Sequence, residues 1–120
     1  MRKVLIVDDS VSMRQMVSFT LRQGGFDVVE AEHGQAAIDK LKGTSVDLVI
    51  TDLNMPVMDG ITLIRKLRAD AGTKSKPILM LTTEGLAAKK EEGKAAGATG
   101  WIVKPFDPEK LLATLARVLP

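Results

Sequence analysis

The sequence predicts an α/β fold: a doubly wound, five-stranded parallel sheet with five helices on both of its faces. Three observations indicate this fold. Short apolar segments alternate with amphipathic segments along the 120 residues, the central apolar segments have no polar side, and glycine or proline marks many of the boundaries. Strands buried on both faces are typical of parallel sheets, whose right-handed crossover helices cover the two faces. Residues 1–120 are therefore expected to form one domain, with no room for an effector domain.

The predicted strands are short apolar runs rich in β-branched residues and bounded by turn residues or charges. In chain order they are Val4–Val7, Phe26–Ala31, Val46–Thr51, Pro77–Leu81 and Gly100–Val103. All but the second are followed at once by side chains that could take part in chemistry.

The predicted helices have apolar residues three or four positions apart and a start or stop signal at an end. The first begins at Ser10 and stops at Gly24, with a core stripe of Met13, Met16, Val17 and Leu21. The others are a helix from Gly34 to Lys42, a helix with Leu63, Ile64 and Leu67 on one face, a helix from Ala87 to Ala96, and a helix that Asp107 caps and Pro108 begins. The helix at 87–96 has little apolar surface and an interior Gly93, so we expect it to be loosely held.

The composition excludes several classes of protein. The absence of cysteine rules out disulfides and thiolate metal sites and fits a reducing compartment such as the cytoplasm. The 17 basic and 15 acidic residues give a net charge of +2, which argues against nucleic-acid binding. No apolar run approaches the roughly 20 residues of a membrane helix, and no signal peptide precedes the first strand. We expect a soluble, cytoplasmic monomer.

Polar side chains follow four of the five strands. Asp8 and Asp9 follow the first, Asp52 the third, Thr82 the fourth and Lys104 the fifth. Because the carboxyl ends of parallel strands share one edge, where ligands bind, we expect these side chains to lie together. Taken singly, each of these side chains has an ordinary explanation: a helix cap, a strand end or a surface charge. Three carboxylates together need a compensating cation, and hard oxygen ligands without cysteine favour Mg²⁺.

Asp52 is the candidate nucleophile of this group, because it ends the central strand of the set. An aspartate can accept a phosphoryl group when a metal ion and an ammonium group neutralise the phosphoryl oxygens. In this interpretation Asp9 and Asp52 bind Mg²⁺ directly and Asp8 holds a coordinated water. Thr82 and Lys104 contact the phosphoryl oxygens.

Over its whole length the chain resembles the receiver domain of two-component response regulators, and especially the stand-alone regulators of chemotaxis. The motifs that carry the resemblance are Asp8-Asp9, residues 52–60 (DLNMPVMDG), Thr82 and Lys104-Pro105-Phe106, in this order and spacing. The resemblance implies the flavodoxin-like strand order 2-1-3-4-5 and phosphorylation of Asp52 by a phosphohistidine of a histidine kinase. It also implies that the backbone carbonyl of Asn54 completes the metal site and that the peptide before Pro105 is cis.

A conformational switch is a further implication of the resemblance. In receivers the hydroxyl residue, here Thr82, moves toward the aspartyl phosphate and an aromatic residue on the fifth strand rotates inward. Trp101 holds that aromatic position, where most members have Tyr or Phe, and Thr83 stands where a smaller residue is common. Both substitutions are expected to limit the rotation. Asn54 and Glu84, which lie two residues after Asp52 and Thr82, are expected to set the lifetime of the phosphorylated state.

The predicted function is a phosphorylation-activated binding switch in chemotaxis or motility. The resemblance implies that the protein catalyses only its own phosphorylation and dephosphorylation, so it is not expected to be an enzyme with a separate substrate. Expected partners are a CheA-like sensor histidine kinase or a histidine phosphotransfer domain. A downstream target, such as a flagellar motor switch protein, would bind the face of the fourth helix, fifth strand and fifth helix. The alternative is a single-domain phosphorelay carrier that passes the phosphoryl group from Asp52 to a histidine phosphotransfer protein.

Two other classes fit the sequence less well. A small phosphohydrolase of related fold would need a second aspartate two residues after the nucleophile, where this chain has Asn54. A flavodoxin-like electron carrier would need a hydroxyl-rich phosphate loop and an aromatic pair, and aromatic residues make up only 3% of the chain.

Overall fold

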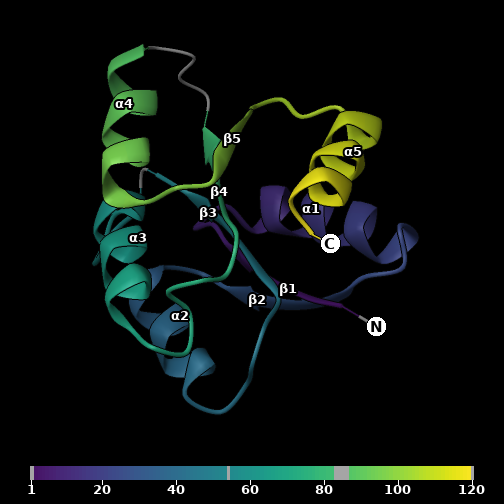
Figure 1. Cartoon of the computed structure of the whole chain (residues 1–120). Coiled ribbons are helices and arrows are strands. Elements are labelled where there is room, and N and C mark those ends of the chain that lie inside the picture. Colours follow the sequence, from purple (N-terminus) through teal and green to yellow (C-terminus); the bar gives the residue numbers. More distant parts are fainter. Residues whose placement is uncertain (1, 54, 83–86, 120) are drawn as a thin grey trace.

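Five strands and five helices alternate along the chain, which confirms the predicted α/β architecture (Figure 1). The structure is a computed structural model that describes residues 2–53, 55–82 and 87–119. The strands are β1 (Lys3–Val7), β2 (Asp27–Ala31), β3 (Leu48–Asp52), β4 (Ile78–Thr82) and β5 (Gly100–Val103). The helices are α1 (Val11–Gln23), α2 (Gly34–Leu41), α3 (Gly60–Ala69), α4 (Ala87–Ala96) and α5 (Pro108–Val118). The ends of these elements lie close to those predicted from the sequence.

The sheet is parallel throughout and has the strand order β2-β1-β3-β4-β5, which confirms the order that the resemblance implied. The chain passes from β1 outward to β2 and then returns to β3 on the other side of β1. The order therefore reverses between β1 and β3. In open parallel sheets this reversal is the place where ligands bind, at the carboxyl ends of the strands. The carboxylates that follow β1 and end β3 lie at this point.

Each face of the sheet has its own apolar core, because side chains alternate along every strand. Leu5 and Val7 of β1 pack with residues of α2 and α3, whereas Val4 and Ile6 pack with residues of α1 and α5. Figure 1 shows α2, α3 and α4 on one side of the sheet and α1 and α5 on the other. All described residues of β3 and β4 are buried, as predicted for central strands. None of the described helices is both long and apolar enough to cross a membrane.

Side-chain caps begin four of the helices at the carboxyl edge of the sheet. Each accepts a hydrogen bond from a backbone N–H of the first turn. The capping residues are Ser10 for α1, His33 for α2, Asp59 for α3 and Asp107 for α5. His33 accepts from the Ala36 N–H through Nδ1 at 3.1 Å, so its side chain has a local structural role at the start of α2.

Met16 was predicted as a core residue of α1, and that prediction is wrong: its side chain is 55% exposed. The buried face of α1 is set by Val17 and Leu21, which are fully covered, with Met13 packed at its margin. Met16 precedes Val17 by one residue, or about 100° around the helix, and so falls on the flank of this face. There it borders α5 through a shallow apolar groove that Leu112 also lines.

The helix α4 approaches the sheet through small residues. Gly93 and Ala96 are buried on it, and a Cβ atom added to Gly93 would lie only 2.0 Å from Met80 Sδ. Methionine of β4 thus occupies the space that a side chain at 93 would need. The interior glycine that looked unfavourable in the sequence is required by this close approach.

Candidate functional site

Three carboxylates meet where the strand order reverses. One oxygen each of Asp8, Asp9 and Asp52 lies within 4.8 Å of the other two. Asp8 is fully buried and Asp52 is 7% exposed, whereas the third residue, Asp9, is exposed to solvent. Asp8 Oδ1 accepts from the Ser10 N–H at 2.9 Å, and Asp52 Oδ1 accepts from the Leu53 N–H at 2.8 Å. The structure thus brings together the three acidic residues that the sequence singled out.

Lys104 is the cation of this cluster. Its Nζ lies 3.1 Å from Asp8 Oδ2 and 3.4 Å from Asp52 Oδ2, and its side chain is only 12% exposed. The backbone N–H of Lys104 donates to the carbonyl of Thr82 at 2.7 Å, which ties the end of β5 to the end of β4. The Lys104–Pro105 peptide is cis, as the resemblance implied. One ammonium group therefore faces two buried carboxylates.

Burial raises the pKa of the Asp52 carboxyl above its ordinary value, and the Asp8 carboxylate raises it further. The Lys104 ammonium and the hydrogen bond from the Leu53 N–H act in the opposite direction without cancelling the rise. The site therefore holds more negative charge than its own cation neutralises. An added divalent cation would relieve this imbalance.

The donor set fits magnesium. Hard carboxylate oxygens that converge from separate segments are the ligands that Mg²⁺ prefers. Each of the three aspartates offers one carboxylate oxygen to this group, and Asp8 is the most deeply buried of them. The predicted carbonyl ligand, Asn54, lies outside the described residues.

The turn after Asp52 brings the start of α3 against the end of β3. The Gly60 N–H donates to the Leu53 carbonyl at 2.9 Å, and a Cβ atom at 60 would lie 2.2 Å from the Asp52 carbonyl oxygen. Only glycine permits this approach. Within the same turn Val57 has a φ of 72°, a backbone conformation that β-branched residues rarely adopt.

Thr82 and Trp101 lie on the same face of the sheet. Thr82 is buried at the end of β4, and Trp101 on β5 is paired in register with Met80, two residues before Thr82. Since every second residue points the same way, both side chains belong to the α4 side. Trp101 is 41% exposed, and Lys90 Nζ of α4 lies 4.8 Å from its ring centroid. The predicted tuning residue Glu84, like Thr83, lies outside the described residues.

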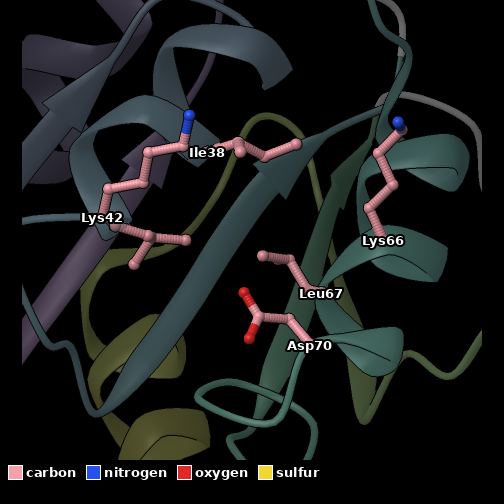
Figure 2. A pocket seen from close by; sticks show the side chains of 6 residues that line it. Ile38, Lys42, Lys66, Leu67 and Asp70 are labelled. Atoms are coloured by element: carbon pink, nitrogen blue, oxygen red, sulfur yellow. The ribbon is translucent and has the colours of Figure 1, made fainter.

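A separate hollow lies between α2 and α3, away from the acidic cluster (Figure 2). Ile38 of α2 and Leu67 of α3 line it from the two helices, together with Lys42, Lys66 and Asp70. Lys42 and Asp70 follow the C-terminal ends of their helices, and helices that return between parallel strands end at the amino edge of the sheet. No residue of the acidic cluster lines this hollow.

Two contributors to the site were not singled out from the sequence. Gly60 was placed only in a turn, and its close approach to Asp52 depends on how α3 packs. Arg14 donates to the Asp8 carbonyl at 2.6 Å, yet in the sequence it is one charged residue on an amphipathic helix. No local pattern marks a side chain whose partner is a backbone atom in another segment.

Comparison with known proteins agrees with this geometry. The sequence profile of the response regulator receiver domain matches residues 4–116, so the chain belongs to that family. The chemotaxis protein CheY1 of Helicobacter pylori is 45% identical over 119 residues, which cover 98% of this chain and 96% of the relative. The solved structure of the chemotaxis protein CheY4 of Vibrio cholerae is 55% identical, covers 99% of both chains and superimposes with a TM-score of 0.96.

A more distant structure bears on the metal. The receiver domain of the sensor histidine kinase PA1611 of Pseudomonas aeruginosa, 27% identical with a TM-score of 0.90, was solved with a magnesium ion coordinated in its active-site cleft. The alignment covers 98% of this chain and 96% of that one. Phosphoryl acceptance is the function of the receiver family to which this chain belongs.

Proposed function

We propose that this receiver accepts a phosphoryl group on Asp52 from a phosphohistidine of a sensor histidine kinase and thereby switches partner binding in chemotaxis. The observation that carries the proposal is the meeting of three carboxylates within 4.8 Å, with the Lys104 ammonium against two of them. The chemotaxis role is supported by the similarity to the chemotaxis proteins CheY1 of Helicobacter pylori and CheY4 of Vibrio cholerae.

Among the three carboxylates, Asp52 is best suited to be the nucleophile. Asp8 is fully buried and cannot be reached by a phosphoryl donor, whereas 7% of the surface of Asp52 is exposed to solvent. Asp9 is accessible, but Lys104 contacts only the other two. Of the three carboxylates, only Asp52 is both exposed to a phosphoryl donor and in contact with an ammonium group that can neutralise the phosphoryl oxygens.

In the proposed step, an oxygen of the Asp52 carboxylate forms a bond to phosphorus as the bond between phosphorus and the partner's histidine nitrogen breaks. The leaving imidazole takes its electron pair with it and is protonated from solvent. The product is an acyl phosphate. Lys104 Nζ, 3.4 Å from Asp52 Oδ2, neutralises one phosphoryl oxygen, and the Thr82 hydroxyl is proposed to donate to another.

Asp9 and Asp52 would hold Mg²⁺ directly and Asp8 would hold it through a water. The ion would neutralise phosphoryl charge and orient the donor. Water attack on phosphorus later breaks the acyl phosphate bond, which returns the Asp52 carboxylate and releases inorganic phosphate. The chemistry thus begins and ends on the protein's own side chain, and Asn54 and Glu84 are proposed to control access of that water.

The response is proposed to pass through Thr82 and Trp101 to the face formed by α4, β5 and α5. It is supported by the shared sheet face of the two side chains and by the partial exposure of Trp101. A downstream target such as a flagellar motor switch protein would bind there. The cysteine-free sequence is compatible with work in a reducing cytoplasm.

Intact mass after incubation with Mg²⁺ and acetyl phosphate tests the acceptor. The wild type is expected to gain one phosphoryl group, and Asp52→Asn is expected to gain none. Asp59→Asn is the matched control, because Asp59 caps α3 and asparagine is an equally good cap. An adduct that persists in Asp52→Asn, or that is lost in Asp59→Asn, would contradict the assignment. Trp101 fluorescence, recorded in the same samples, reports whether the switch follows.

A further inference from the structure

Arg14 links three segments beside the acidic cluster. It lies in the first turn of α1, its Nη1 donates to the Asp8 carbonyl at 2.6 Å, and its Nε lies 3.4 Å from Glu30 Oε1 near the end of β2. Its side chain is 15% exposed, so the guanidinium is largely withdrawn from water. Arg22 also approaches Glu30, at 3.9 Å, but it is 56% exposed.

The two neighbouring aspartates differ in what holds them. Asp8 has several partners: its N–H donates to the Ala31 carbonyl, its Oδ1 accepts from the Ser10 N–H, and its carbonyl accepts from Arg14. Its Oδ2 has no hydrogen bond but forms an ion pair with Lys104. The Asp9 carboxylate, by contrast, has no hydrogen-bond or ion-pair partner within residues 2–53, 55–82 and 87–119. Its place near Asp52 therefore depends on the backbone that carries it.

The Asp8 carbonyl and the Asp9 N–H belong to one planar peptide unit. A hydrogen bond that fixes the carbonyl therefore also fixes the direction in which Asp9 leaves the chain. We propose that Arg14, held in place by Glu30, is a positioning residue of the acidic site: it sets the Asp8–Asp9 peptide so that the Asp9 carboxylate faces Asp52 and can bind a divalent cation. This inference rests on the proposed function, because it takes the three carboxylates to be the metal site.

Charge and position make opposite predictions for Arg14, which makes the inference testable. If Arg14 acted only through its positive charge, its removal would strengthen the binding of another cation nearby. If it positions Asp9, its removal weakens that binding because the carboxylate is no longer held where the metal needs it. Partners that orient metal ligands typically contribute about 10- to 100-fold in affinity.

The test is calorimetric titration of the full-length protein with MgCl₂ alone. Arg14→Ala is expected to weaken Mg²⁺ binding about 10-fold. Arg14→Lys, which keeps the charge and one donor, is expected to lie between wild type and Arg14→Ala. Arg22→Ala is the matched control: it removes a positive charge beside the same Glu30 carboxylate but has no contact with Asp8, and it should change the affinity little.

A double-variant comparison isolates the role of Glu30. Glu30→Gln alone is expected to weaken Mg²⁺ binding, whereas in an Arg14→Ala background it should add no further loss, because the guanidinium that it holds is gone. If charge alone were at work, the two changes would add. Hydrogen exchange gives an independent readout: the backbone amides of Asp9 and Ser10 should exchange faster in Arg14→Ala than in Arg22→Ala.

The outcomes separate this inference from the proposed function. Wild-type affinity or tighter binding in Arg14→Ala, with Asp52-dependent binding intact in the wild type, overturns the positioning role and leaves the proposed function standing. If the wild type itself does not bind Mg²⁺, both the positioning role of Arg14 and the proposed function are overturned. At saturating Mg²⁺, phosphoryl labelling of Arg14→Lys should recover toward the wild-type rate, because the ion then compensates for the poorer position of Asp9. If Arg14→Ala does not fold, Arg14→Lys and Glu30→Gln decide the question.

Discussion

The centre and the β5 edge of the sheet are built differently. In the centre, β3 and β4 are buried along their whole length. At the edge, residues of β5 alternate between partly buried and exposed, with Trp101 at 41% and Val103 at 42%. The helix α4 beside this edge approaches β4 through Gly93 instead of a large side chain.

In the proposed function, this difference separates chemistry from response. Charged groups that must keep their relative positions are best placed on well-packed strands, and Asp52 ends such a strand. Segments with little buried apolar surface open and rearrange at lower free energy. The proposed function uses both properties, and β4 lies between the strand that ends at Asp52 and the β5 edge.

The largest test compares two isoleucines on these strands. Ile50 of β3 is fully buried, so Ile50→Ala should reduce the free energy of unfolding by about 2–5 kcal/mol. Ile102 of β5 is only partly buried, and Ile102→Ala should reduce it by about 1 kcal/mol, since less apolar area is lost. Urea denaturation at constant m-value measures both. Equal losses would show that the edge is packed as firmly as the centre.

The second-largest effect is expected at the contact between α4 and the sheet. Gly93→Ala should destabilise the protein by about 1–3 kcal/mol, because the added methyl group meets Met80 Sδ. In a Met80→Ala background the same change should be neutral or stabilising by up to about 1 kcal/mol, since alanine is the better helix former. A Gly93→Ala protein that is more stable than the wild type would mean that α4 is not seated on Met80.

The acidic site supplies a test that depends on pH. The native pKa of Asp52 is raised above its ordinary value of 3.8, so the folded state holds this proton where the unfolded chain has lost it. Stability is therefore lost as pH rises from 3.8 through the native pKa. Without Mg²⁺, Asp52→Asn should melt at a higher temperature than the wild type at pH 7, and the gap should shrink toward pH 4.

Asp59 is the control for that pH series, because its pKa is shifted in the opposite direction from that of Asp52. Hydrogen bonds from Thr62 lower the native pKa of Asp59, so its contribution to stability is present at neutral pH and is lost as the solution becomes acid. Asp59→Asn should therefore not raise the melting temperature at pH 7. A wild-type protein that melts no lower than Asp52→Asn at neutral pH would argue against charge repulsion at the site.

The smallest expected effect concerns the exposed edge. Lys90→Met removes the ammonium group 4.8 Å from the Trp101 ring, an interaction worth about 0.5–1 kcal/mol at an exposed site. Acrylamide should then quench the Trp101 fluorescence differently from the wild type. Lys89→Met is the matched control, because Lys89 pairs with Glu92 instead. Identical quenching in the two variants would show that Lys90 does not restrain the ring.

Much of the site could be predicted because it depends on strand ends. Once five apolar runs are recognised as parallel strands, Asp8, Asp52, Thr82 and Lys104 must lie along one edge, whatever the details of packing. The structure confirms that Asp8, Asp52 and Lys104 are in contact. The same argument fails for Met16, because helical spacing defines a stripe and only the neighbouring α5 decides which margin of that stripe is covered.

The sequence by itself determined the class of fold, the order of elements and the set of acidic and basic residues at the carboxyl edge. These follow from the alternation of continuous apolar runs with segments of helical apolar spacing, and from the identity of each residue at a strand end. Tertiary structure alone decided that Arg14 reaches the Asp8 carbonyl, that Met80 fills the space beside Gly93, and that the Asp52 pKa is raised. Distance and burial cause these effects, and both arise only when segments remote in the chain pack together.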